Sequence, residues 1–332
     1  MVITSEWENM GFDELLRAAR SLSRKNFNNS IHFYAPGFLY YVNRYYHSSP
    51  KTFPSISITG NRCSLNCDHC GGKLLSSMIP APTPEKLYQV CRKIYEDGGI
   101  GCLISGGCLP DGSVPLGRFV EVIGRVKREL GLKLVVHTGL IDEATAHGLR
   151  EAGVDAALID VIGSDETIRD VYHLKAGVRD YEKALHALHT SGLPLIPHVV
   201  VGLHYGEVKG ELQALKMISK YDPSALVIVA LRTIQGTPME GISPPPPEEI
   251  GRIIAIARLL LPKVPIVLGC ARPLGRHRVV TDALALKAGV NAIAFPAEKT
   301  IELAKAMGLK ITFSPLCCSQ IYEDISGSAL SH

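Results

Sequence analysis

The 332-residue chain lacks a long apolar run, a large net charge and any low-complexity tract. Its longest apolar stretch, Ile253–Leu268, is interrupted by two prolines, an arginine and a lysine, so we expect no membrane-spanning helix. Residues 1–12 lack the apolar core of a secretory signal. A net charge of +3 gives no broad basic surface, which argues against a nucleic-acid partner. We therefore expect a cytoplasmic protein that works without membrane or nucleic acid.

An internal repeat is also absent, and general disorder is excluded because 46% of the residues are apolar. A chain with a large core does not need its nine cysteines as disulfide staples. In a reducing compartment, clustered cysteines are more often metal ligands or catalytic groups. Three of them, Cys63, Cys67 and Cys70, crowd into one short segment, whereas residues 1–53 contain none.

Short apolar runs rich in β-branched residues alternate along the chain with segments of helical periodicity. We predict strands at about 55–59, 101–105, 133–137, 156–160, 195–201, 225–230, 265–268 and 292–295. Helices are predicted between them, at about 84–96, 116–130, 142–152, 179–191, 206–221, 247–261 and 281–288. Eight strand–helix units in series predict an α/β fold, a (β/α)8 barrel of the TIM type.

Two segments flank the predicted barrel, which we place at residues 54–305. Residues 1–53 are expected to form an N-terminal extension that holds a helix and an aromatic stretch. Residues 306–332 are expected to form a C-terminal tail with a ninth strand-like run, followed by Cys317 and Cys318. A tail that returns to the barrel would bring these cysteines to its mouth, where the loops after the strands carry the chemistry.

The clustered cysteines form a C-x3-C-x2-C loop directly after the first predicted strand. Three thiolates from one short loop can hold three irons of a cubane cluster and leave the fourth iron open to a small molecule. A structural zinc site requires four protein ligands, and no fourth lies at zinc-finger spacing. A disulfide would leave one of the three thiols unpaired. The loop therefore predicts an iron–sulfur cluster with an open coordination position, bound by Cys63, Cys67 and Cys70.

With this loop after strand one, residues 54–300 resemble the radical S-adenosylmethionine superfamily. The resemblance implies a [4Fe–4S] cluster whose open iron binds S-adenosylmethionine, and reductive cleavage of that cosubstrate to a 5′-deoxyadenosyl radical. It places Cys63, Cys67 and Cys70 as cluster ligands and His69 near the adenine. The remaining residues that it places at the cosubstrate follow later strands; they are Ser105, Gly106, Gly107, Asp160, Gly202 and Glu207.

Four further cysteines also follow predicted strands, and we expect them to converge at one barrel mouth: Cys108, Cys270, Cys317 and Cys318. Such convergence suggests a second iron–sulfur cluster, with one of the adjacent pair as a ligand and the other as a bystander. The resemblance to biotin synthase, which holds a second cluster with barrel cysteines and an arginine, draws attention to Arg272. The alternative is that these cysteines are ordinary buried residues, as we expect for Cys91 and Cys102.

The overall pattern resembles the biotin synthase-like proteins of archaea, including the two-protein lipoyl synthase. This resemblance implies sulfur insertion into an octanoyl-lysine on a lipoyl carrier protein or octanoylated peptide. It also implies a second radical enzyme subunit and an electron donor such as ferredoxin as partners. Two alternatives stay open. One is a related radical mutase or methylase that needs no second cluster, and the other is a non-enzymatic iron–sulfur protein.

Overall fold

A computed structural model describes Trp7 and residues 10–329, with side chains described as far as Ile325. Its centre is one sheet of 11 strands in the order β11-β1-β10-β9-β8-β7-β6-β5-β4-β2-β3. All neighbouring strands run parallel. The strands are β1 (Ser30–Tyr34), β2 (Ser55–Ser57), β3 (Ile79–Pro80), β4 (Gly101–Ser105), β5 (Lys133–His137), β6 (Ala156–Asp160), β7 (Leu195–Val201), β8 (Leu226–Ala230), β9 (Ile266–Leu268), β10 (Ala292–Ala294) and β11 (Lys310–Ser314).

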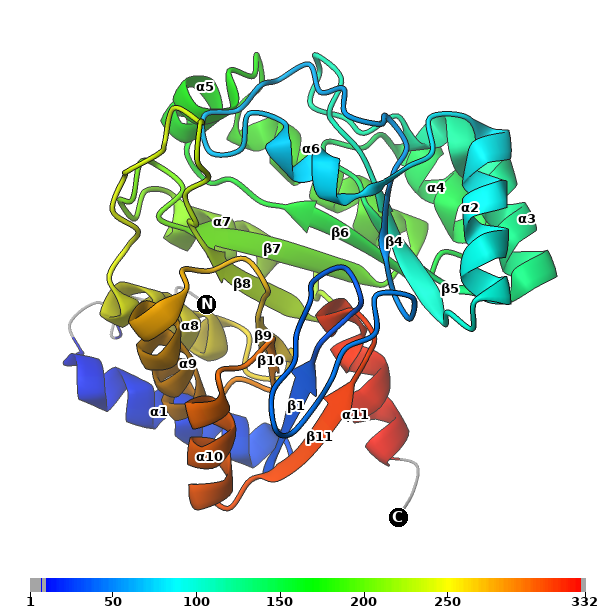
Figure 1. Cartoon of the computed structure of the whole chain (residues 1–332). Helices are drawn as coiled ribbons and strands as arrows, with labels where there is room; N and C mark the ends of the chain where they lie inside the picture. The colour runs from blue at the N-terminus through cyan, green and yellow to red at the C-terminus, as the bar shows by residue number, and fades with distance from the viewer. Residues whose placement is uncertain (1–6, 8–9, 330–332) are drawn as a thin grey trace.

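The predicted (β/α)8-type architecture is confirmed, in an open form. β3 and β11 are the two ends of the sheet, so the curved sheet does not close on itself. Helices cover its outer side, as Figure 1 shows. They are α1 (Phe12–Asn26), α2 (Pro84–Glu96), α3 (Val120–Leu130), α4 (Glu143–Glu151), α5 (Asp165–Tyr172), α6 (Val178–Ser191), α7 (Glu211–Ile218), α8 (Pro247–Leu260), α9 (Gly275–Ala288) and α10 (Glu298–Ala306). The last helix, α11 (Ile321–Ala329), packs against the interior side instead.

Local sequence signals set several of these helix ends. The Thr83 side chain accepts a hydrogen bond from Lys86 N at the start of α2, and Pro84 occupies the first turn. α6 ends at Gly192, whose left-handed backbone costs a glycine little. α7 is shorter than predicted: it begins at Glu211 rather than at Gly206. The preceding residues form a turn rather than a helix.

The sheet recruits strands from outside the predicted barrel segment. β1 pairs with β10 on one side and with β11 on the other, so the N-terminal extension contributes an inner strand. The ninth strand-like run is confirmed as β11, at the edge of the sheet. Strands from all three predicted segments thus share one sheet, and the division of the chain at residues 53 and 305 stays a prediction.

Two buried layers result from this curvature. One lies between the sheet and the surrounding helices, and the other fills the barrel interior. The interior layer includes Val135, Leu158 and Val227 from the strands, together with Cys317 and Cys318 from the tail. The short 3₁₀ helix η4 (Cys318–Gln320) carries the tail into contact with β6 and β10.

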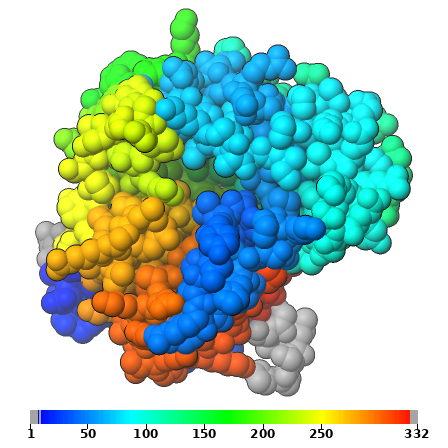
Figure 2. Space-filling model, viewed as in Figure 1, coloured from blue at the N-terminus to red at the C-terminus, as the bar shows by residue number. Residues whose placement is uncertain are grey.

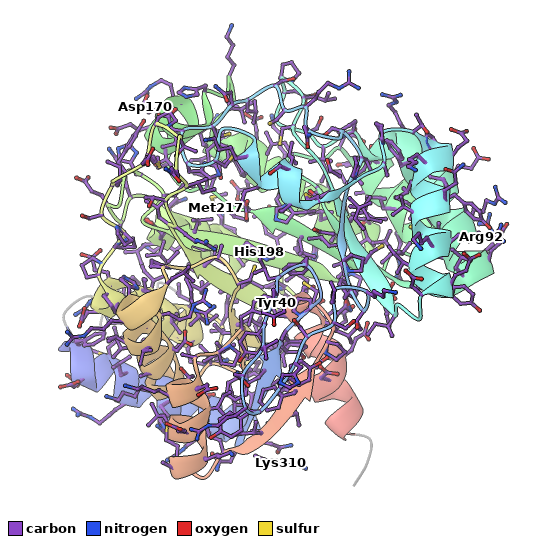
Figure 3. All side chains as sticks on the ribbon, in the orientation of Figure 1. Tyr40, Arg92, Asp170, His198, Met217 and Lys310 are labelled. Carbon is purple, nitrogen blue, oxygen red and sulfur yellow. The ribbon has the colours of Figure 1, made fainter. Side chains whose placement is uncertain are left out.

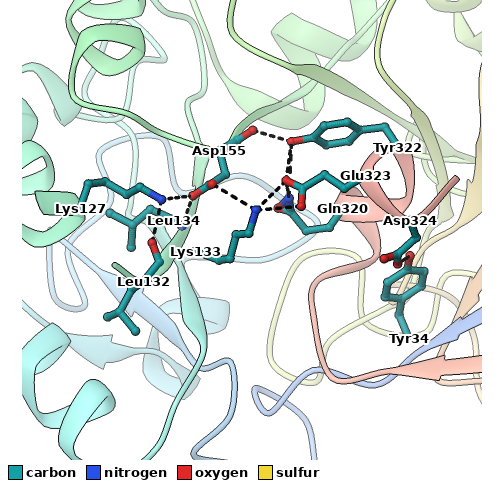
Figure 4. A network of polar contacts seen from close by, with 10 residues as sticks. All are labelled: Tyr34, Lys127, Leu132, Lys133, Leu134, Asp155, Gln320, Tyr322, Glu323 and Asp324. Atoms are coloured by element: carbon teal, nitrogen blue, oxygen red, sulfur yellow. Dashed lines mark hydrogen bonds and ion pairs between the residues drawn. The ribbon is translucent and has the colours of Figure 1, made fainter. Parts of the chain in front are cut away.

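Polar contacts fix α11 against both sides of the barrel (Figure 4). Tyr322 Oη donates a hydrogen bond to Asp155 O at 2.6 Å, beside the start of β6. Lys133 Nζ of β5 lies 2.8 Å from Glu323 Oε2. From the opposite side, Tyr34 of β1 hydrogen-bonds Asp324. The tail therefore closes the interior of the open barrel.

Among the described residues, no helix combines the length and apolarity needed to cross a bilayer.

Candidate functional site

A cavity of about 290 Å³ lies at the carboxyl ends of the strands β2, β4, β5 and β6. On the face drawn in Figure 2, the green of the middle strands is visible at the bottom of a hollow between the loops. The cysteine loop, the Gly106–Gly107 turn and Asp160 line the cavity together. This is the edge of a parallel barrel at which active sites form.

The three predicted cluster cysteines share one tight loop. Cys67 is buried, and Cys63 and Cys70 are partly exposed to the cavity. The backbone of Cys67 accepts hydrogen bonds from Cys70 N at 3.1 Å and from Gly71 N at 2.7 Å, which curls the loop around the thiols. A hydrogen bond from Cys67 lowers the pKa of the Cys70 thiol, and His69 lowers it further. Such a thiol readily becomes the thiolate that binds iron.

The Gly106–Gly107 turn packs directly against this loop. A Cβ atom on Gly107 would lie 2.1 Å from Arg62 O and 2.7 Å from Cys63 Cα, so no other residue fits there. Gly107 N also donates a hydrogen bond to Thr59 Oγ1 at 2.7 Å. The second glycine is therefore required by the approach of two protein segments, in addition to any ligand.

Asp68 ties the cysteine loop to two other loops. Its carboxylate lies 2.7 Å from His173 Nε2 after α5, and it accepts a hydrogen bond from Tyr205 Oη, also at 2.7 Å. Met239 N, in the Gly-Thr-Pro segment after β8, donates to Asp68 O at 3.3 Å. Asp68 was not singled out from the sequence, because its partners lie more than a hundred residues away.

His69 provides a direct indication that the cavity takes a ligand. Its Nδ1 atom is buried and has no hydrogen-bond partner among the described residues. The ring lies 5.3 Å from the ring of Tyr172, centroid to centroid. Because buried polar atoms are normally paired, an unpaired nitrogen on a cavity wall points to a partner supplied by a bound molecule.

Asp160 ends β6 as a charged group on the cavity wall. Burial alone would raise its pKa, but His137, whose Nε2 lies 3.6 Å from Asp160 Oδ1, lowers that pKa to about 2. An ionised carboxylate accepts hydrogen bonds only. Asp160 is thus suited to hydroxyl groups of a cosubstrate or substrate. Ser105, predicted nearby, donates its hydroxyl to His137 O at 3.3 Å.

The turn after β7 differs from the sequence prediction in its acidic residue. Neither Gly202 nor Glu207 lines the cavity, and Glu207 is exposed. The buried carboxylate is Glu211, which accepts a hydrogen bond from Gly202 N at 2.8 Å and has a pKa raised by burial. A Cβ on Gly202 would lie 2.5 Å from Pro245, so this glycine serves the packing of the proline run.

The structure does not bring the four remaining predicted ligands together. Cys108 lies beside the cysteine loop: Ser64 N donates to Cys108 O at 2.8 Å, and Cys108 shares the cavity with Cys63. Burial and then the nearby Cys63 thiol raise the pKa of Cys108 to about 12. The cause of this placement is the Gly106–Gly107 turn, which directs the chain against the loop.

Cys270, Cys317 and Cys318 form a separate group in the barrel interior. Cys317 and Cys318 are 5% and 6% exposed, and Cys270 packs against the same interior layer. Cys318, then Ser319, lowers the pKa of the Cys317 thiol. Three soft ligands in one buried space fit a metal cluster.

Arg272 lies near that group and is held by other partners. Its side chain is fully buried and pairs with Asp282, with Nε 2.8 Å from Oδ1. The guanidinium also donates to Gly269 O at 2.6 Å and to Phe295 O at 3.3 Å. The Asp282 carboxylate also accepts hydrogen bonds from Thr300 Oγ1 and Ala297 N. The arginine therefore supports the Cys270 loop.

Cys91 and Cys102, which we expected in the core, are both fully buried between α2 and β4.

Comparisons with known families match two parts of the chain. Residues 57–216 match the family model described as the radical SAM superfamily. Residues 228–310 match the model of the biotin and thiamin synthesis associated domain. The first match contains the cysteine loop and most of the cavity wall, and the second contains Cys270.

Curated relatives and solved structures agree with these matches. A biotin synthase of Prochlorococcus marinus (strain NATL2A) is 28% identical over 251 residues, covering 72% of this chain and 70% of the relative. A biotin synthase of Cenarchaeum symbiosum (strain A) is 26% identical over 250 residues, covering 71% of this chain and 74% of the relative. The crystal structure of methylornithine synthase superposes with a TM-score of 0.61 at 20% identity, covering 95% and 91% of the two chains. The crystal structure of a maturase of the [FeFe]-hydrogenase superposes with a TM-score of 0.64 at 14% identity, covering 97% of this chain and 75% of the maturase.

Proposed function

Because the chain belongs to the radical S-adenosylmethionine superfamily, in its biotin synthase-like branch, we propose that it inserts sulfur into an unactivated hydrocarbon chain. Its cofactors are a [4Fe–4S] cluster and S-adenosylmethionine, as the family requires. When bound, this pair supplies the one-electron chemistry that opens a carbon–hydrogen bond. The chain's own residues hold these groups, shape the cavity and carry a second site.

In the proposal, Cys63, Cys67 and Cys70 bind the first cluster. Their thiols share one loop that contains no fourth cysteine, and the loop faces the cavity. Asp68 holds the loop in place through His173 and Tyr205. This donor set fits a cluster that keeps one coordination position for a small molecule.

The cosubstrate is proposed to occupy the cavity beside this loop. Gly106 and Gly107 offer backbone that a ligand can approach closely. His69 offers its unpaired Nδ1, and Asp160 offers an ionised carboxylate for hydroxyl groups. Ser105 lines the same cavity, whereas Gly202 and Glu207 lie outside its wall, in the turn that Glu211 anchors.

The proposal of sulfur insertion is supported above all by the second group of thiols. Cys270, Cys317 and Cys318 lie in the barrel interior, separate from the cysteine loop. His137 connects the two regions, because it lines the cavity while Val135, on the same face of β5, packs in the interior layer with Cys317. In the proposal, a sulfur donor held there is separate from the radical source.

The cavity wall favours an alkyl chain as the substrate. Much of it is apolar, formed by Leu65, Leu75, Leu103, Leu140 and Leu174 among others. An octanoyl group on a lysine would bury its methylenes there while its carrier stays outside. We therefore propose a lipoyl synthase subunit, acting on a lipoyl carrier protein or octanoylated peptide in the cytoplasm. A second radical subunit and a ferredoxin-type electron donor would complete the system.

Metal analysis of the whole chain tests this function. After anaerobic reconstitution we expect about eight irons and eight sulfides per chain, from two clusters. The double variant C270A/C317A should retain about half, and S-adenosylmethionine cleavage should survive. Cys91→Ala serves as the matched control, because Cys91 is a fully buried cysteine on the outer side of the sheet. About four irons in the wild type, unchanged in C270A/C317A, would favour a radical mutase or methylase instead.

A further inference from the structure

The proposed second cluster lacks a ligand if only the interior cysteines bind it. Two adjacent residues, Cys317 and Cys318, rarely ligate the same cluster together, which leaves one of them with Cys270. Cys108 lies beside the first cysteine loop, in the cavity, and the Arg272 guanidinium already donates to Asp282 and to two carbonyls. The strands that face the interior are therefore the place to look for a further donor.

His137 is placed to be that donor. It lies at the carboxyl end of β5, on the cavity wall, and Val135, on the same face of that strand, packs in the interior layer together with Cys317. Its Nε2 lies 3.6 Å from Asp160 Oδ1. No hydrogen bond to Nδ1 is present in the part of the chain that the structure describes. Histidine ligands commonly hold one ring nitrogen toward a carboxylate and bind the metal with the other, and this ring has that arrangement.

His198 lies in the middle of the barrel (Figure 3), and its ring packs against that of His137. The two rings are 5.5 Å apart, centroid to centroid. The ligand atoms of His137, Asp160 and His198 all lie within 4.8 Å of one another. His198 Nδ1 is 3.1 Å from Ile196 O, and a carbonyl can only accept, so this nitrogen carries the proton.

We propose that His137 is the nitrogen ligand of the second iron–sulfur cluster, alongside Cys270 and Cys317, and that Asp160 orients its ring. This inference rests on the proposed function, because it presumes the second cluster. A neutral imidazole in place of a thiolate makes the cluster less negative, which raises its reduction potential. His198 would act as a positioning residue that packs against the ligand.

Pulsed electron paramagnetic resonance on a chain with only the second cluster tests this ligand. The variant C63A/C67A/C70A removes the first site and leaves the interior untouched. After reconstitution and reduction, we expect iron, acid-labile sulfide and a strong ¹⁴N coupling. Adding H137A should abolish the coupling, and adding H137C should keep the iron without the coupling. The control His147→Ala, on the exposed face of α4, should change neither.

The outcomes separate the two levels of the proposal. Absence of iron and sulfide from C63A/C67A/C70A would contradict the second cluster, and with it the proposed function. Iron and sulfide without a ¹⁴N coupling, or a coupling lost in H198A and kept in H137A, would overturn only the role of His137. Iron without sulfide would overturn it in favour of a mononuclear metal. Should the loop variant fold poorly, iron per chain in H137A with an intact loop decides: we expect a loss of about half.

Discussion

Some residues at this site have structural roles that cannot be inferred from the residue type alone. Gly107 is a glycine because Cys63 and Arg62 O occupy the space of its side chain. Glu211, rather than Glu207, is the buried acid that holds the turn after β7. The glycine pair and the cysteines were predictable from spacing. The role of Glu211 was not, because it depends on where α7 begins.

The glycine pair offers a test at the residue scale. In Gly107→Ala the new Cβ would lie 2.6 Å from Cys63 Cβ and 2.1 Å from Arg62 O, so the cysteine loop must shift. We expect this variant to fold but to lose most of the iron of the first cluster, measured after anaerobic reconstitution. Gly106→Ala is the matched control, since its closest contact would be Thr59 at 3.1 Å. Equal iron in the two variants would contradict the packing role of Gly107.

At the scale of elements, the local sequence pattern predicted the strands whose limits depend on nearby residues. The strands β4 to β10 match the predicted ranges within two residues, because each is a short β-branched run between turn signals. β1 was missed: Ser30–Tyr34 lies next to an aromatic stretch, and its partners β10 and β11 are some 260 residues away. The inward direction of His137 depends on strand register, which the sequence alone does not determine.

The attachment of α11 gives a prediction for one element. In Lys133→Met the pair with Glu323 is lost; both side chains are about one-third exposed, so we expect a loss of roughly 0.5–1 kcal/mol in unfolding free energy at pH 7. Partial burial alone would raise the pKa of Glu323, but Lys133 lowers it. The pair therefore stabilises the fold above the unfolded pKa of glutamate, about 4.3, and this contribution is lost as pH falls through the folded value.

Denaturant unfolding of wild type and Lys133→Met at pH 7 and near pH 3 measures this difference. The gap between the two proteins should close at the lower pH, once Glu323 is protonated. Lys86→Met, on the exposed face of α2, is the control and should leave the unfolding free energy unchanged at both pH values. A gap of the same size at both pH values would mean that Lys133 acts through packing and not through its charge.

At the scale of the whole molecule, one group of thiols lines the cavity and a second lies in the barrel interior. β2 and β4 carry the cysteine loop and the glycine turn on one side, and β9 with the returning tail carries Cys270, Cys317 and Cys318. The tail reaches the interior because the barrel is open and α11 binds β1 and β5 from either side. In the proposed function, radical formation and sulfur donation therefore use different ends of the same chain.

This separation predicts that the two half-reactions can be uncoupled by mutation. Cys67→Ala should abolish 5′-deoxyadenosine formation, because no fourth cysteine in the loop can replace it as a ligand. Cys270→Ala should still form 5′-deoxyadenosine, since its site lies apart from the loop, but should transfer no sulfur to an octanoyl-lysine peptide. Chromatographic assay of both products, with the second subunit and a reductant present, measures the two steps in one reaction. Full sulfur transfer by Cys270→Ala would make this cysteine an ordinary packing residue and remove the donor from the barrel interior.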